Sequence, residues 1–132
     1  MEYVIYSNNS AIGPEVEGIA VTRVTGGIEA IYEVISDWLQ QGYALVSTPL
    51  PANVPLIRSP VRSVILKKSP RQYDAQGLIT LEKAKERTAV LGVVDDARTR
   101  ADLEFIDKDQ LLRTIAQLGE LDRQTGRDGG NA

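Results

Sequence analysis

Residues 19–47 read IAVTRVTGGIEAIYEVISDWLQQGYALVS, and this stretch decides the fold. Its first part, Ile19–Val24, is rich in β-branched residues and predicts a strand. Apolar residues then recur at helical spacing over residues 28–39, and Gly42 stands where a left-handed C-terminal cap is expected. The apolar run 43–47 predicts a second strand. A strand, a helix and a strand in this order favour two strands that run parallel.

The rest of the chain supplies two more strands and two more helices. Residues 3–6 and 61–67 are short β-branched and aromatic runs, and the second has the continuous apolar centre of a strand buried on both faces. Apolar positions over 81–91 predict a helix with Thr80 as its N-cap, and a third helix follows Asp107, which begins a capping-box pattern. We therefore expect an α/β fold: a small two-layer or three-layer sheet of about four mostly parallel strands with three helices.

The domain organisation follows from length and composition. The chain has 132 residues, of which 42% are hydrophobic and 25% charged, and this suits one globular core. From residue 122 onward the sequence has no large apolar residue that a core could bury. We expect a single α/β domain over residues 1–121 and a flexible tail over 122–132.

Two missing residue types restrict the chemistry. The chain has no cysteine and no histidine. Disulfides, thiolate nucleophiles, serine–histidine hydrolysis and histidine-ligated metals are therefore excluded. The acidic residues do not fall at any metal-binding spacing. We expect no catalytic residue, no cofactor and no metal site.

The charge pattern bears on partners and location. The net charge is −3, with both signs mixed along the chain, which argues against nucleic-acid binding. No run approaches the ~18 apolar residues of a membrane span, and the first residues lack the pattern of a secretory leader. We expect no membrane partner and a cytoplasmic location.

Three polar turns, 7–9, 25–27 and 47–49, directly follow predicted strands. In a parallel sheet they would meet at the carboxyl edge, where open α/β folds bind ligands. The second turn also opens a helix, whose N-terminus favours a phosphate or a carboxylate. The simpler interpretation of each is a plain turn or cap. The candidate ligand-binding residues are Asn8, Asn9, Thr25, Gly26, Gly27, Thr48 and Arg58.

Arg58 enters that set from a basic run around the last predicted strand. The run comprises Arg58, Arg62, Lys67, Lys68 and Arg71. We interpret it as a solvated edge that guards against strand pairing. In the alternative, Arg58 lies in the proline-rich loop, folds over the crevice and holds an anion.

Several segments together resemble the GrdX family, small proteins encoded beside the glycine, sarcosine and betaine reductase components of anaerobic bacteria. The segments are YVIYSNN (3–9), GYALVSTPL (42–50), PVRSVIL (60–66), LEFID (103–107) and the pair Leu111-Leu112. The resemblance implies an accessory role near selenium-dependent reductases and supplies no catalytic residue. In the family a histidine commonly stands where this chain has Thr48.

Three hypotheses follow. The first is a non-catalytic accessory protein that binds a small anionic ligand or a reductase component at the sheet edge. The second is an enzyme acting on a small anionic substrate, with Arg58 as a clamp, Asn8 or Asn9 orienting the substrate, and a carboxylate base that the sequence does not place there. The third is a homodimer, because a small sheet often completes its core through a two-fold axis.

Overall fold

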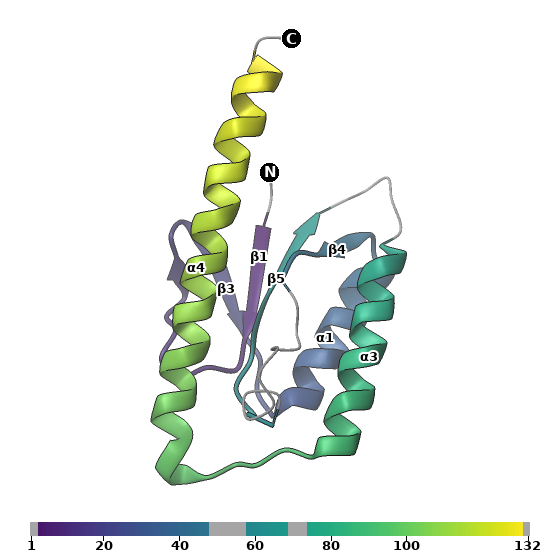
Figure 1. Ribbon diagram of the computed structural model, residues 1–132, viewed down its shortest axis with the longest axis vertical. Coiled ribbons are helices and arrows are strands. Elements are labelled where there is room, and N and C mark those ends of the chain that lie inside the picture. Colours follow the sequence, from purple (N-terminus) through teal and green to yellow (C-terminus); the bar gives the residue numbers. More distant parts are fainter. Residues whose placement is uncertain (1–2, 48–57, 69–73, 131–132) are drawn as a thin grey trace.

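The computed structural model describes residues 3–47, 58–68 and 74–130, with side chains as far as residue 120. These residues form an α/β fold with three helices and one five-stranded mixed sheet (Figure 1). The elements in chain order are β1 (Tyr3–Ser7), β2 (Glu15–Val16), β3 (Ile19–Arg23), α1 (Ile28–Gln40), β4 (Tyr43–Leu45), β5 (Ser63–Lys68), α3 (Ala75–Leu91) and α4 (Ala97–Gly130).

The strand order is β2-β3-β1-β5-β4. Only the β1–β3 pair is parallel, whereas β5 runs antiparallel to both of its neighbours and β2 runs antiparallel to β3. The prediction of about four mostly parallel strands was therefore wrong in number and in direction. The fifth strand, β2, has two residues, too few to produce a periodic pattern.

The unit β3-α1-β4 confirms one part of the predicted strand–helix–strand unit, the common direction of its two strands. Because β5 is antiparallel to both β1 and β4, strands β3 and β4 do run in the same direction. They are separated in the sheet by β1 and β5 and form no parallel pair. The centre of β5, Val64 to Leu66, is completely buried, which is the burial predicted for a strand covered on both faces.

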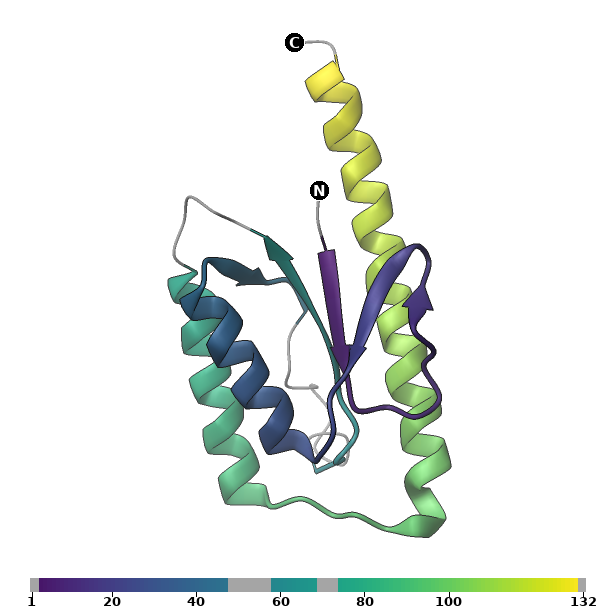
Figure 2. The ribbon, with the colours of Figure 1, turned by 180° about the vertical axis from the view of Figure 1, so that it is seen from behind.

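Helices cover both faces of the sheet, α1 and α3 on one face and α4 on the other (Figures 1 and 2). Side chains of β5 alternate accordingly: Val64 and Leu66 pack in the cluster under α1 and α3, and Ile65 packs in the cluster under α4. Leu111 and Ile115 close this second cluster. The molecule is thus built of three layers.

Helix α1 has the predicted apolar face. Its buried residues lie at helical spacing on one side: Ile28, Ile31, Tyr32, Ile35 and Leu39. Trp38 is partly buried against them and packs on Tyr43, with ring centroids 4.5 Å apart and the ring planes tilted by 56°. Gly42 follows the helix with φ of +92°, a conformation that glycine adopts without a Cβ clash. This segment confirms the prediction.

Helix α3 begins earlier than predicted. Asp74 is its N-cap, and the carboxylate accepts a hydrogen bond from Gly77 N at 2.8 Å. Thr80, predicted as the cap, lies inside the helix and donates to the carbonyl of Gln76. The predicted core positions Leu81, Ala84 and Thr88 are buried. The prediction missed this first turn, Ala75–Leu78, because it contains a glycine and only one large apolar residue, which is too little for an apolar period.

Helix α4 is longer than predicted and runs from Ala97 to Gly130. Asp107, predicted to cap it, is inside the helix and almost completely buried. The capping-box pattern was therefore misleading, since the same acid can also serve as a buried hydrogen-bond acceptor. The backbone of residues 122–130 continues α4. Hydrogen exchange would test the predicted flexibility of residues 122–132.

Candidate functional site

The ends of three strands meet at one edge of the sheet. In the register of β1, Ser7 pairs with Arg23 at the end of β3 and with Ser63 at the start of β5. At the other side of β5, the backbone N–H of Ser47, just after β4, donates to the carbonyl of Ile65. The turns that follow β1, β3 and β4 therefore leave the sheet at the same edge.

Asn8 fastens two of these turns together and is buried. Its Nδ2 donates to the carbonyl of Pro60 at 2.8 Å and to that of Gly26 at 3.3 Å. Its Oδ1 accepts from Arg62 N at 2.7 Å. The amide group thus holds the turn after β3 against the segment that enters β5, and its bonding is to the protein's own backbone.

Asn9 fastens the turn after β1 to α4. It is completely buried, and its Nδ2 donates to the carbonyl of Glu104 at 2.8 Å and to Asp107 Oδ2 at 3.0 Å. Its Oδ1 accepts from Ala11 N at 2.9 Å. Next to it, Ser10 donates through both its backbone N–H and its hydroxyl to the Glu104 carboxylate. The turn after β1 is consequently anchored to the first half of α4.

Asp107 is the carboxylate at the centre of this edge. Its Oδ1 accepts from Ser63 N at 3.0 Å, and its Oδ2 accepts from Ser63 Oγ at 2.6 Å. Ser7 Oγ lies 2.7 Å from Ser63 Oγ and accepts from Asn9 N at 3.0 Å. Hydroxyl and amide donors therefore surround the carboxylate, and both oxygens of this buried group have hydrogen-bond partners.

A cavity of about 420 Å³ opens beside Asp107, between α4 and the ends of β4 and β5. Most of the residues that line it are polar, and they include two arginines, two serines and a threonine. The lining residues are Val46, Ser47, Arg62, Ser63, Asp107, Gln110, Leu111, Arg113, Thr114 and Gln117. Its volume is within the range of small-molecule sites in proteins.

Arg62 departs from the predicted solvated edge. It is only 4% exposed and precedes β5, which is an interior strand. Burial lowers the pKa of its guanidinium, and the nearby Tyr32 hydroxyl and Asp107 carboxylate offset part of that lowering. Removal from water, rather than proximity to other cations, is what disfavours the charged form. The edge interpretation was wrong for Arg62, while Lys68 is exposed and Arg71 lies outside the described residues.

Two further hollows flank this edge. One, of about 200 Å³, lies on the turn after β1 and is lined by residues that include Ser7, Asn9 and Arg23. The other, of about 630 Å³, lies between α1 and α3, where Tyr32 and Thr88 share a buried hydrogen bond of 2.7 Å. Neither includes a buried charged side chain among the described residues that line it.

The predicted ligand-binding residues are distributed around this edge. Asn8 and Gly26 are in direct contact, and Asn9 reaches Asp107. Thr25, Gly26 and Gly27 are exposed, and Gly27 is the N-cap of α1. Arg58 is exposed, and its carbonyl accepts from the N–H of Val94 at 2.8 Å. Thr48 lies outside the described residues.

Sequence reasoning missed four residues that line the cavity beside α4: Arg62, Ser63, Asp107 and Arg113. Arg62 was hidden in a run of basic residues, and Asp107 and Arg113 belong to a helix whose position the sequence does not give. The one available signal was the pair Arg62-Ser63, which stands between a proline-rich loop and a buried strand.

None of the helices in the described part of the chain combines the length and apolarity needed to cross a membrane. Within the same residues, no three acidic side chains lie together as metal ligands would.

Comparison with known proteins assigns the family. A family model described as GrdX-like protein matches residues 4–116. The chain belongs to the GrdX-like protein family. The matched range extends from β1 into α4, so the edge residues from Ser7 to Arg113 all lie within the GrdX-like region. No curated protein and no solved structure matches the chain.

Proposed function

We propose that this GrdX-like protein is a non-catalytic accessory protein of the cytoplasm that binds a small anionic ligand or a reductase component at the sheet edge. The observation that carries the proposal is the 420 Å³ cavity beside Asp107, which has two arginines in its wall. Because the three polar turns leave the sheet at this edge, a ligand bound in the cavity would contact or order them.

The charges around the cavity favour an anion. Arg62 is buried, so its guanidinium has exchanged most of its water for protein and gains from a nearby negative charge. Arg113 lies on the accessible side of α4, where its Nε is paired with Asp109 at 2.9 Å. Ser47 Oγ accepts from Ile65 N, and a hydroxyl that accepts one bond still carries its own O–H donor. The Arg113 guanidinium and a hydroxyl donor suit a carboxylate or a phosphate, and Arg62 adds a positive charge close to the cavity.

The predicted residues retain a role in this proposal as the frame of the site. Asn8 and Asn9 fix the turns, and Gly26 and Gly27 present the N-terminus of α1 at the same edge. We keep Thr25, Thr48 and Arg58 as candidate contacts at the margin of a bound ligand. Arg58 is not among the described residues that line the cavity, so a contact would require its side chain to turn inward.

Thermal unfolding with a panel of anions tests the small-ligand half. We expect the melting temperature of the wild type to rise with phosphates, nucleotides or amino acids. The Arg113→Gln variant should lose most of that rise, because Arg113 lines the cavity. Arg98→Gln is the matched control, since Arg98 is on the same helix, is 94% exposed at its side chain and does not line the cavity. A flat response to every anion, or equal responses of both variants, would refute this half.

Membership of the family supports the reductase half, which the resemblance to the GrdX family implies. Immobilised protein and purified glycine, sarcosine and betaine reductase components provide the test. We expect one component to bind and the Arg113→Gln variant to bind it more weakly. Absence of binding to all components at micromolar concentration would remove this half and leave the anion response as a separate result.

An enzyme acting on a small anionic substrate is the second candidate, and one observation favours it. A carboxylate does lie at the edge, because Asp107 contacts both Asn9 and the Ser63 hydroxyl. It ranks second because three donors of the protein already occupy the Asp107 oxygens, so the carboxylate has little room to accept a proton from a substrate. Turnover of small phosphate or carboxylate esters that disappears in Ser63→Ala would reverse the ranking.

A further inference from the structure

The outer face of α4 carries an apolar stripe that no part of the described fold covers. Phe105 is 71% exposed and Leu112 is 37% exposed. Ala101 and Ala116, also exposed, extend the stripe by one turn at each end. An adjoining face of the helix, with Leu111 and Ile115, packs on the sheet. The stripe is therefore separate from the side of α4 that holds the fold and the candidate site.

The pattern of this stripe is symmetrical along the helix. Its residues are Ala101, Phe105, Leu112 and Ala116, separated by four, seven and four residues. Their sizes, small, large, large and small, also read the same in both directions. In an interface between two identical chains related by a two-fold axis, residue i of one copy meets residue j of the other and the reverse, so this pattern places large residues against large ones and small residues against small ones.

We propose that α4 pairs antiparallel with α4 of a second copy of this chain, about a two-fold axis that passes between Lys108 and Asp109. In this pairing Phe105 packs on Leu112 of the second copy, and Ala101 packs on Ala116 of the second copy. The alanines at the two ends let the helix backbones approach closely, Phe105 and Leu112 pack on each side of the axis, and at the axis the exposed Lys108 of each copy lies opposite Asp109 of the other. The proposal goes beyond the proposed function and does not depend on it.

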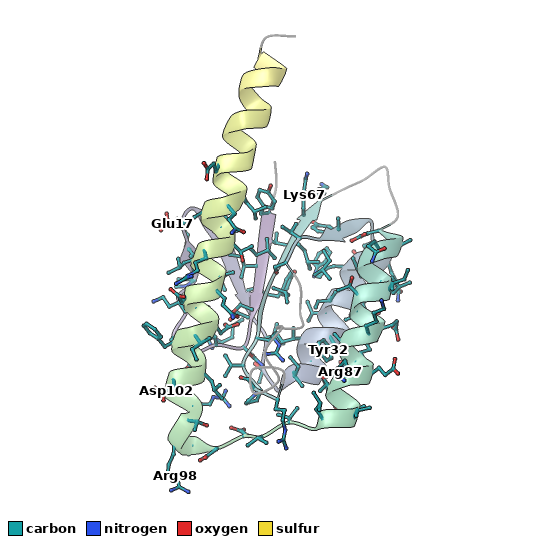
Figure 3. All side chains as sticks on the ribbon, viewed as in Figure 1. Glu17, Tyr32, Lys67, Arg87, Arg98 and Asp102 are labelled. Atoms are coloured by element: carbon teal, nitrogen blue, oxygen red, sulfur yellow. The ribbon has the colours of Figure 1, made fainter. Side chains whose placement is uncertain are left out.

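Charged residues at the ends of the stripe complement one another in the same arrangement. Arg98, whose side chain is 94% exposed, precedes the stripe, and the exposed Glu120 follows it. Antiparallel pairing brings Arg98 of each copy near Glu120 of the other. Figure 3 shows Arg98 at the N-terminal end of α4, directed away from the sheet. Next to the axis, Asp109 is neutralised within its own chain by Arg113 at 2.9 Å.

Molar mass measured by light scattering after size exclusion, from micromolar to submillimolar concentration, is the first test. We expect the wild type to approach twice the mass of one chain as its concentration rises. Phe105→Glu should remain a monomer, because it places two charges in the centre of the stripe. Val90→Glu on α3 is the control, since Val90 is 73% exposed and lies off the stripe. A monomeric wild type, or a Phe105→Glu variant that still dimerises, would overturn the proposal.

Charge exchange gives a second, independent readout on exposed positions. Arg98→Glu alone and Glu120→Arg alone should each weaken the dimer, because each creates a like-charge pair with the second copy. The double variant should recover the wild-type mass, since the complementarity is restored with the signs reversed. Equal weakening in the double variant and in the single variants would contradict the pairing.

Cross-linking tests the direction of the pairing. The chain has no cysteine, so each introduced thiol is the only one present. A mixture of Ala101→Cys and Ala116→Cys should form a disulfide between unlike variants under mild oxidation, and neither variant should cross-link to itself. Self-cross-linking of Ala101→Cys would show a parallel arrangement and refute the antiparallel one.

Discussion

Asn9 Nδ2 donates to Asp107 Oδ2 at 3.0 Å, and this hydrogen bond joins the end of β1 to the middle of α4. The same carboxylate accepts two hydrogen bonds from Ser63, at the start of β5. One buried acidic group therefore fixes two central strands and the helix that covers them. The polar edge that carries the candidate site is also a structural joint, so its residues affect stability as well as binding.

Replacement of Asp107 by alanine should destabilise the protein by about 3 kcal/mol, because it leaves Ser63 N, the Ser63 hydroxyl and Asn9 Nδ2 without their acceptor in a buried place. Asp109→Ala is the matched control, because Asp109 makes a salt bridge in which its side chain is 46% exposed, and it should cost about 0.5 kcal/mol. Urea unfolding of both variants measures the difference. Equal losses would show that the Asp107 network contributes no special stability.

The local elements of this fold could be predicted from the sequence, but the order of the strands could not. Helix α1 follows from an apolar period of five buried residues, and the centre of β5 follows from a continuous apolar run. Both are properties of adjacent residues. Strand order depends on which strand β5 joins after the proline-rich loop, and no pattern within a strand records its neighbour.

The same distinction applies to the candidate site. The meeting of the turns after β1 and β3 was predictable, since both strands leave the sheet in the same direction. The contribution of α4 was not, because Asp107 and Asn9 are far apart in the chain and the position of the helix over the sheet is set by packing. The capping-box pattern at Asp107 further obscured its buried role, because local spacing cannot distinguish a cap from a core acceptor.

Gly77→Ala should destabilise α3 by about 2 kcal/mol, since an added Cβ would lie 2.1 Å from Asp74 Oδ2 and displace the N-cap. The displaced carboxylate would also lose the hydrogen bond that it accepts from Leu45 N at 2.8 Å. Gly119→Ala is the contrasting control, because a Cβ there meets nothing within 4 Å and should stabilise α4 by about 0.5–1 kcal/mol. Thermal unfolding reports both, and a stable Gly77→Ala variant would contradict the role of the cap.

Stability should fall above about pH 10 partly through Tyr6. Burial raises the pKa of Tyr6 above 10.0, the nearby Tyr43 adds to the rise, and hydrogen bonds with Trp38 and Thr22 oppose it. Below pH 10.0 the folded and unfolded states both keep the proton, so the contribution to stability is complete. As the pH rises through the folded pKa that contribution is lost, because the unfolded chain releases its proton first. Tyr6→Phe should therefore show a shallower alkaline decline in urea unfolding, and parallel curves for the two proteins would contradict the assignment.

Asn8→Asp should make stability depend on pH in a way that Asn8→Ala does not. In the wild type Asn8 Nδ2 donates to the carbonyls of Pro60 and Gly26, and the ionised carboxylate of the Asn8→Asp variant would direct negative charge at those oxygens. The pKa of the introduced carboxyl group should rise in the folded variant above the unfolded value of about 3.9, because the site is buried and faces acceptors. The variant should thus approach the stability of the wild type near about pH 4, where the protonated carboxyl can donate to Pro60, and lose about 2–3 kcal/mol relative to it at neutral pH.

Asn8→Ala lacks a titrating group, so its deficit should stay constant over the same range. Urea unfolding at several pH values separates the two outcomes, and a deficit of Asn8→Asp that does not change with pH would show that the Asn8 amide is not the donor that fastens the two turns.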